Sequence, residues 1–183
     1  SGTSLREIST RARVTQALIT YYFGTKEALF MEVFLRRGRD IAARRIAALD
    51  ALIEGRKPFT LPDVVRAYLW PALEMRRTRE GRAFIRLQAR MHTEPPRFAE
   101  QLRHEVYDDT ARRFVKAIRV AAPHVSERAA YWRMILTVGA YLYAHSDAHR
   151  LERISGGLCD PDDLDQMLDQ VTAFVVGGIV IWV

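Results

Sequence analysis

The chain has 183 residues, of which 49% are hydrophobic and 27% are charged. This composition is typical of a globular protein and argues against a disordered or membrane-spanning one. The formal net charge is +6, which favours an anionic partner. Residues 1–60 carry 11 Lys and Arg against 6 Asp and Glu, whereas residues 61–183 carry 17 against 16. A basic N-terminal third is what a phosphate-binding surface requires; a merely solvated basic face is the alternative.

Cysteine content and hydropathy argue against a disulfide-bonded, secreted or membrane-spanning protein. The single cysteine, Cys159, cannot form an internal disulfide or a cysteine-rich metal site, and it fits a reducing compartment. No basic-then-apolar secretory leader opens the chain, and the longest apolar run, residues 174–183, is too short to cross a bilayer as a helix. We therefore expect a cytoplasmic protein with no membrane partner.

The first 34 residues predict a helix-turn-helix. Ser4 and Glu7 form an S-x-x-E capping box at the start of a short amphipathic helix. The apolar pattern breaks at Arg13 and restarts after Thr15, a good N-cap for a second short helix. Such a pair presents its second helix to the major groove of DNA. A third helix starts at Lys26 and keeps its period to about residue 53, with these arginines on its polar side: Arg36, Arg37, Arg39, Arg44 and Arg45.

The rest of the chain also predicts helices alone. Gly and Pro within residues 54–58 mark a boundary. Helical spacing then covers 62–71, where Pro71 should kink or divide the helix, and continues in 81–92, 96–122, 126–149 and from about 160 to 178. No strand alternation occurs, so the fold class is all-α. We place a helix-turn-helix domain at residues 1–35 and a helical domain at 36–183.

Nothing in the sequence argues for catalysis. His145 and His149 stand one helical turn apart, but no further Glu or Cys pattern completes a metal site. The acidic residues 160–165 lack the mid-loop Gly and terminal Glu of a calcium loop. No phosphate loop or nucleophile motif is present. We expect no metal, no cofactor and no catalytic residue.

Residues 8–29 resemble the signature of TetR-type transcriptional regulators. The resemblance rests on Ile8-Ser-Thr-Arg-Ala-Arg-Val14 and on Leu18-Ile-Thr-Tyr-Tyr-Phe-Gly-Thr-Lys-Glu-Ala-Leu29. It implies an all-helical dimeric repressor with an N-terminal DNA-binding domain and a C-terminal domain for ligand binding and dimerisation. The chain departs from the family in having Arg13 where Gly is usual, and in lacking a helix before the first one here. Because it opens with Ser1-Gly2 and no Met, we expect it to begin inside a longer protein.

The resemblance assigns a palindromic double-stranded DNA operator as the partner. Thr3 and Ser4 would orient the first helix on phosphate. The exposed positions of the second helix would be Thr15, Gln16, Ala17, Thr20 and Tyr21. Gln16 suits a base edge best, because its amide can pair bidentately with adenine. Tyr22 and Lys26 would contact phosphate, Lys26 from a helix N-terminus, with core packing as the alternative for Tyr22.

The C-terminal part is expected to bind a small apolar effector and to form the homodimer. The expected pocket residues are Tyr68, Trp70, Met75, Leu87, Met91, Phe114 and Tyr141, with core packing as the alternative. Residues 114–140 weakly resemble regulators of fatty-acid metabolism, which suggests a fatty-acyl-like ligand. The last two helices are expected to dimerise through Gly139, Leu142, Leu168, Val171 and Val175, unless their apolar stripes bury within one chain.

A different class of function remains as the rival hypothesis. The chain would then be a helical small-molecule-binding protein or enzyme in which the basic N-terminus is incidental. Such a protein needs a convergent polar site, and the candidates for it are His92, Glu94, His145 and His149.

Overall fold

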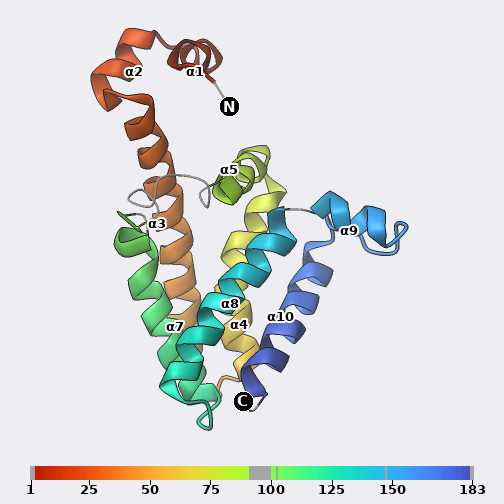
Figure 1. The fold of residues 1–183 in the computed structure, drawn as a ribbon. Coiled ribbons are helices and arrows are strands. Elements are labelled where there is room, and N and C mark those ends of the chain that lie inside the picture. Colours follow the sequence, from red (N-terminus) through yellow and green to blue (C-terminus); the bar gives the residue numbers. More distant parts are fainter. Residues whose placement is uncertain (1–2, 91–99, 102, 147, 182–183) are drawn as a thin grey trace.

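The computed structural model describes residues 3–90, 100–101, 103–146 and 148–181. Their regular structure is helical and contains no strand, which confirms the all-α prediction. Figure 1 shows α1 and α2 at one end of the long helix α3, with the other helices gathered around its second half. The elements are α1 (Leu5–Ala12), α2 (Gln16–Phe23), α3 (Lys26–Ile53), α4 (Leu61–Leu73), η1 (Glu74–Arg77), α5 (Arg79–Arg90), η3 (Arg103–Tyr107), α7 (Asp108–Ala121), α8 (Glu127–Ser146), α9 (Ala148–Ile154) and α10 (Leu164–Val180).

The N-terminal helices begin at side-chain caps. The Ser4 hydroxyl accepts from the Glu7 N–H at 3.2 Å, and the Glu7 carboxylate accepts from the Ser4 N–H at 2.7 Å, which confirms the capping box. Thr15 caps α2 and Thr25 caps α3 by accepting the backbone N–H three residues further on. Each cap satisfies an amide that has no partner inside its helix. The predicted starts of these three helices are therefore confirmed.

The turn between α1 and α2 is built on a left-handed residue. Arg13 has φ 56° and ψ 41°, and no other non-glycine residue in the described part of the chain has a positive φ. The Arg13 N–H bonds to the Thr10 carbonyl at 3.2 Å, and the Val14 N–H bonds to the Ser9 carbonyl at 3.1 Å. This pair of bonds ends a helix on a left-handed residue, a place where glycine carries no steric cost.

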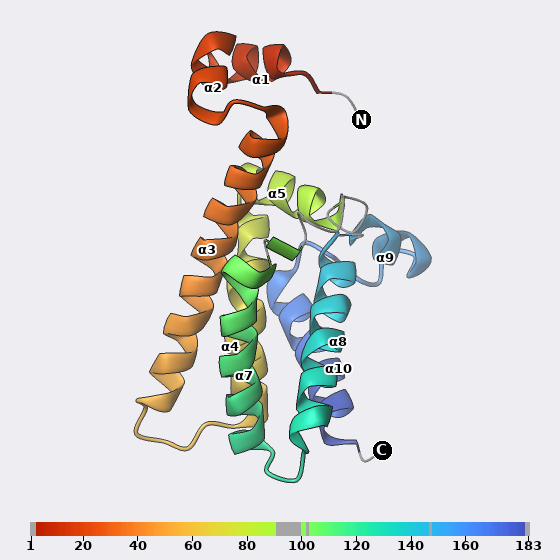
Figure 2. The ribbon, with the colours of Figure 1, turned by 60° about the vertical axis from the view of Figure 1, so that its left-hand side comes forward.

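Helix α3 is shared by both parts of the molecule. Its 28 residues span about 42 Å, and it continues unbroken through residue 35, where we placed the domain boundary. Figure 2 shows α3 running from α2 down alongside α4 and α7. One face is buried over the helix, and its members are Met31, Phe34, Leu35, Gly38, Ile41, Arg45 and Leu49. Because this face continues well beyond the turns next to α2, the two N-terminal helices are anchored in the C-terminal core.

Helix α4 lies at the centre of the C-terminal part. It packs against α3, α7 and α10, while α8 packs against α5, α7 and α10. Val64, Leu69 and Leu73 of α4 are at most 1% exposed. Arg133 of α8 donates to the carbonyl oxygens of Ile179 and Ile181 and so ties the end of α10 to α8.

Three helix boundaries differ from those expected from the sequence. Pro71 does not end its helix, because α4 continues to Leu73 before tightening into the 3-10 turn η1; a buried proline removes one hydrogen bond but fills core space. The chain enters α7 through a π-helical turn, η3, rather than a continuous α-helix. The helix predicted to reach residue 149 ends at residue 146, and α9 follows as a separate helix.

The π-helical turn η3 presses closely on α3. A Cβ atom at Gly38 would lie 2.9 Å from Val106 Cγ1 and 3.1 Å from the Tyr107 hydroxyl. A larger residue at position 38 would therefore push η3 away from α3. The close approach places Tyr107 beside the buried face of α3.

Replacing Arg13 by glycine should stabilise the protein. A left-handed non-glycine residue costs roughly 1–2 kcal/mol, so Arg13→Gly should raise the free energy of unfolding by about 1 kcal/mol, measured by chemical denaturation. The matched control is Arg11→Gly, two residues earlier inside exposed α1, which should lower it by roughly 0.5–1 kcal/mol. Destabilisation by both changes to the same extent would contradict the strain assigned to Arg13.

Candidate nucleic-acid interface and internal cavity

Helix α2 turns most of its side chains to solvent. Ile19 is its one fully buried residue, at 6% exposed, and Phe23 is half-buried. All the residues predicted to read DNA are exposed: Thr15, Gln16, Ala17, Thr20 and Tyr21. Tyr22 is 69% exposed. Its ring packs edge-to-face with that of Tyr21, with 5.2 Å between the ring centroids. Exposure of Tyr22 leaves no role for it in the core, so α2 offers an aromatic and amide-bearing surface to a partner.

The residues predicted to contact phosphate lie at helix starts. Thr3 and Ser4 precede α1, and Lys26 is the first residue of α3; all three are exposed. Helix N-termini attract anions through their unpaired amides and dipole. The hydrogen bonds from Ser4, first from its backbone N–H and then from its hydroxyl, hold the pKa of Glu7 below its usual value. Glu7 therefore remains charged and keeps α1 capped.

A cavity of about 170 Å³ lies inside the C-terminal part. Residues of α3, α4, α5, η3, α7 and α8 form its walls, so most helices of the C-terminal part contribute to it. The lining residues are Phe34, Arg45, Tyr68, Gln88, Arg103, Tyr107, Asp108, Ala111, Met134, Ile135, Val138, Tyr141 and Leu142. Ile135 is also 63% exposed, so the cavity reaches the surface beside α8.

The predicted pocket residues divide between the cavity and the core. Tyr68 and Tyr141 line the cavity. Phe114 lies behind it, 1% exposed and with its ring 5.0 Å from that of Tyr68. The others lie elsewhere: Met75 is buried in the core, Leu87 is half-buried against the core, and Trp70 lines an open groove between α3, α4 and α10. Met91 falls outside the described residues.

The most unusual group in the cavity wall is the guanidinium of Arg45. We expected this residue on the polar side of its helix, but it is 1% exposed. Its Nε donates to the Tyr68 carbonyl at 2.7 Å, and its guanidinium carbon lies 3.7 Å from the centre of the Tyr68 ring and 5.4 Å from that of Tyr141. Its Nη2 has no hydrogen-bond partner in the part of the chain that the structure describes. A sequence signal was present, because Ile41 and Leu49, four residues on either side of Arg45, mark the same buried face.

The charge of Arg45 is incompletely compensated. Removing a cation from water costs several kcal/mol, and the unpartnered Nη2 adds about 1–3 kcal/mol. A desolvated cation–π contact contributes about 2 kcal/mol in the opposite direction. Among the described residues, no carboxylate lies within ion-pair distance of Arg45: Asp108, in the same wall, pairs with Arg112 at 3.9 Å. An anion is the group that would best complete this site.

The hydroxyls of Tyr68 and Tyr107, which line the cavity, are neutral. Burial raises the pKa of Tyr107 to about 12, although the charge of Arg45 opposes the shift. Burial likewise raises the pKa of Tyr68, against the same opposing charge. The Tyr107 oxygen accepts from Gln88 Nε2 at 3.4 Å, which leaves its own proton available to another acceptor.

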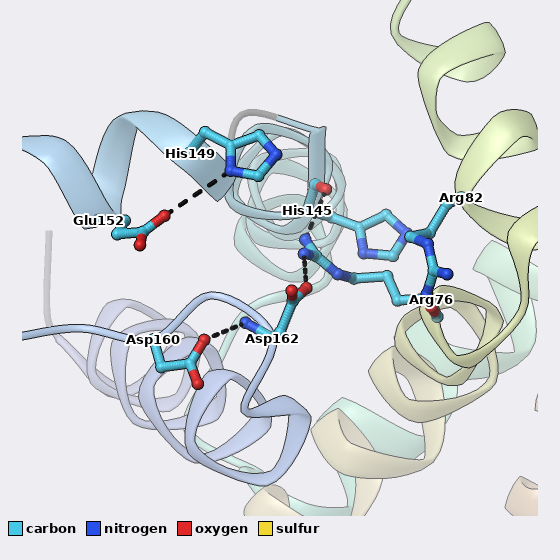
Figure 3. A network of polar contacts seen from close by, with 7 residues as sticks. All are labelled: Arg76, Arg82, His145, His149, Glu152, Asp160 and Asp162. Carbon is cyan, nitrogen blue, oxygen red and sulfur yellow. Dashed lines mark hydrogen bonds and ion pairs between the residues drawn. The ribbon is translucent and has the colours of Figure 1, made fainter. Parts of the chain in front are cut away.

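A second buried cation, Arg76, holds together η1, α8 and the start of α10 (Figure 3). Its Nη1 donates to the His145 carbonyl at 3.1 Å and its Nη2 to Asp162 at 2.7 Å. The backbone N–H of Asp162 in turn donates to the carboxylate of Asp160 at 2.8 Å. Part of the acidic run therefore fixes the chain before α10, and Asp163 caps that helix.

His145 lies beside this pair in an environment that keeps it neutral. The residue is 3% exposed, and neither ring nitrogen has a hydrogen-bond partner among the described residues. Burial, followed by the charges of Arg76 and Arg45, lowers the pKa of His145 to about 3. The imidazole is therefore a buried uncharged group between two cations.

The polar residues of the rival hypothesis do not converge in the described part of the chain. His145 is buried, whereas the side chain of His149 is 90% exposed and lies 3.7 Å from Glu152. His92 and Glu94 lie outside the described residues. No group of three or more His, Cys, Asp or Glu side chains suited to a metal occurs among the described residues. A search of the same residues found no helix long and apolar enough to span a membrane.

The residues expected at a dimer interface also divide into two sets. Leu168, Val171 and Val175 of α10 are 5–8% exposed within the single chain, on the helix that packs against α4. Leu142 is half-buried and lines the cavity. Gly139 is exposed, and a Cβ there would meet no atom within 4 Å. The three α10 residues thus belong to the intrachain core that we had left as the alternative.

A different apolar surface is open on the same two helices. Its members are Trp132, Leu136 and Tyr143 of α8 and Phe174 of α10, which are 59–72% exposed. On α8 the spacing of Trp132, Leu136, Gly139 and Tyr143 follows one helical face. Helices α8 and α10 therefore carry apolar residues on two faces, one buried and one exposed.

The neutral His145 should make stability fall in acid. The unfolded chain binds a proton at this residue below a pKa of about 6.5, whereas the folded chain does so only near pH 3. The contribution is thus complete above pH 6.5 and declines as the pH falls towards 3. Between pH 7 and pH 5 it should remove about 2 kcal/mol from the free energy of unfolding.

The measurement compares chemical unfolding of the wild type and His145→Leu at the two pH values. The variant should lose about 2 kcal/mol less than the wild type on acidification. His149→Leu, which changes an exposed histidine on the neighbouring helix, is the control and should behave as the wild type does. Equal pH dependence in all three proteins would show that His145 is not held neutral.

Two family models match the chain. The model for "Bacterial regulatory proteins, tetR family" matches residues 1–33, which hold α1, α2 and the start of α3. The model for "Tetracyclin repressor-like, C-terminal domain" matches residues 66–178, from within α4 to near the end of α10. No curated protein matches the chain. The second match alone covers more than half of the sequence, and together with the capped helix-turn-helix it shows that the chain belongs to the TetR family of DNA-binding transcriptional regulators.

Proposed function

We propose that the protein is a dimeric repressor that leaves a palindromic operator when a small apolar effector enters the cavity. The observation that carries the proposal is the course of α3. This helix begins beside the exposed helix α2, and its residues Phe34 and Arg45 form part of the cavity wall. Residues 1–35 would be the DNA-binding domain and 36–183 the effector-binding and dimerisation domain.

The proposed DNA contacts follow from exposure and chemistry. Gln16 would read a base edge, because its amide offers one donor and one acceptor side by side. Thr15, Ala17, Thr20 and Tyr21 would complete the contact with the major groove. Thr3, Ser4, Tyr22 and Lys26 would position the module on phosphate.

The proposed dimer uses the exposed apolar face of α8 and α10. A two-fold operator requires a two-fold protein, and large apolar side chains clustered on a surface suit a buried interface. Gly139 lies on the same face with open space above it, which would allow a partner helix to approach closely. Phe174, at 72% exposed, is the largest side chain that α10 offers.

Operator release would follow from a change in the position of α3. Nineteen residues separate Lys26 from Arg45 along the same helix, about 28 Å. The packing of α2 against the start of α3 would transmit a tilt of α3 to the reading surface. An effector can cause such a change only by binding one arrangement more tightly than the other.

The DNA contacts are tested by gel-shift titration. Gln16→Ala should relax the preference at one base position by roughly 1–3 kcal/mol, because a bidentate base contact is lost. Lys26→Ala should weaken binding to all sequences alike and lower the salt slope by about one, because one counterion fewer is released. These roles would be excluded if the wild type bound no fragment of the source genome. They would also be excluded if the variants kept the wild-type specificity and salt slope.

The dimer is tested by sedimentation and circular dichroism. Phe174→Glu should give a folded monomer with reduced operator affinity, because a carboxylate would be buried unpaired in the proposed interface. Val171→Glu, three residues earlier on the core side of α10, should instead unfold the chain, at a cost of several kcal/mol. A folded Phe174→Glu dimer with wild-type affinity would exclude this face as the interface.

A further inference from the structure

The chemistry of the cavity defines a narrower class of effector than apolarity alone. This inference rests on the proposed function, because it takes the internal cavity to be the effector site. The cavity wall carries two cationic side chains, Arg45 and Arg103, and one anionic side chain, Asp108. Asp108 already faces Arg112 at 3.9 Å. Arg103 is exposed to solvent, so the buried charge of the wall is that of Arg45.

Arg45 therefore determines which kind of charged group the cavity favours in a ligand. Its guanidinium is almost entirely buried, and one terminal nitrogen, Nη2, has no partner. The hydrogen bond from Nε to the Tyr68 carbonyl and the ring of Tyr68 at 3.7 Å fix the position of the guanidinium. A fixed guanidinium with unused donors matches the geometry of a carboxylate.

The remaining wall is apolar and aromatic. Phe34, Ala111, Met134, Val138 and Leu142 line it together with the tyrosine rings. The other cation of the wall, Arg103, is exposed to solvent, so a second ligand charge would find no buried partner, whereas a monoanion would satisfy Arg45 and bury an apolar body. The Tyr107 hydroxyl, which accepts from Gln88, retains a proton to donate to the same anion.

The volume limits the size of that apolar body. A protein cavity of about 150 Å³ accommodates benzene, and the cavity here measures about 170 Å³. The space suits a single ring or a short branched chain bearing one carboxylate. A long acyl chain would exceed the enclosed space and extend through the opening beside α8.

We propose that the effector is a small monocarboxylate with a compact apolar body, bound with its carboxylate on the guanidinium of Arg45. Binding would pair a charge that is unpaired without the ligand, and it would do so on α3, the helix that carries the DNA-binding module. The effector class and the proposed release of DNA thus depend on one residue.

Isothermal titration calorimetry of the full chain tests the ligand class. The probes are benzoate, phenylacetate and 3-methylbutanoate as compact carboxylates, benzamide as the uncharged counterpart of benzoate, and dodecanoate as a long-chain acid. At least one compact carboxylate should bind, and benzoate should bind at least tenfold more tightly than benzamide, because a buried charge pair is lost with the amide. Binding by none of the compact carboxylates, equal binding of benzoate and benzamide, or binding of dodecanoate alone would overturn the proposal.

Variants of α3 test the role of Arg45. Arg45→Met should fold, since an apolar residue can replace a buried cation, and should bind the compact carboxylates at least tenfold more weakly while binding benzamide as before. Arg45→Gln, which keeps a donor and removes the charge, gives the same test if the methionine variant does not fold. Arg44→Met is the matched control, because Arg44 pairs with Glu74 outside the cavity. Unchanged carboxylate binding in both Arg45 variants would overturn the assignment.

A gel shift in the absence of any probe separates this inference from the proposed function. A chain that binds DNA but none of the compact carboxylates overturns the effector class and leaves the DNA-binding regulator intact. A chain that binds carboxylates through Arg45 but binds no DNA contradicts the proposed function and supports the cavity chemistry.

Discussion

The continuity of α3 is the constraint on which the rest of the structure depends. Helices α1 and α2 have eight residues each, too few to be stable alone in water. They hold their shape through local caps, through contact with each other, and through contact of α2 with α3. Helix α3 is held in turn by a buried face that extends to Leu49 within the C-terminal core. The orientation of the reading surface is therefore set by packing along α3 that begins at Met31 and extends to Leu49, about 34 Å from Lys26.

The same helix carries a charge that packing alone does not justify. Buried cations in proteins are usually paired, and exceptions tend to occur where function requires them. Arg45 lies between Ile41 and Leu49 on a face that is otherwise apolar, apart from Gly38. Methionine or leucine at this position would fill the space without a desolvation cost. A buried guanidinium at this position is what the proposed carboxylate effector would require.

The sequence predicted those features that depend on a few neighbouring residues. The caps at Ser4, Thr15 and Thr25 each join a side chain to an amide three residues away, so the pattern can be recognised from the sequence. The resemblance places Arg13 where the family usually has Gly, and the structure gives this residue a left-handed backbone. The TetR signature extended these local predictions to the arrangement of the two domains.

Features that depend on tertiary packing could not be predicted in the same way. Val171 and Phe174 are both apolar and three residues apart on α10, and only the position of α4 decides that the first is buried and the second exposed. The close approach of the π-helical turn to α3 also depends on tertiary packing, because Gly38 leaves room for Val106 and Tyr107. Arg45 was assigned to solvent for its charge, although its helical position placed it on the buried face.

These packing relations also bear on how an effector and DNA can act on one another. An effector changes DNA affinity only if its contacts differ between the two arrangements of the protein. An apolar wall offers little difference, because it would pack against a ligand in either arrangement. An unpaired guanidinium offers a large one, since its interaction with an anion depends steeply on distance and on the exclusion of water. Because that guanidinium belongs to α3 and not to α7 or α8, the proposed effector would act directly on the helix that carries the DNA-binding module.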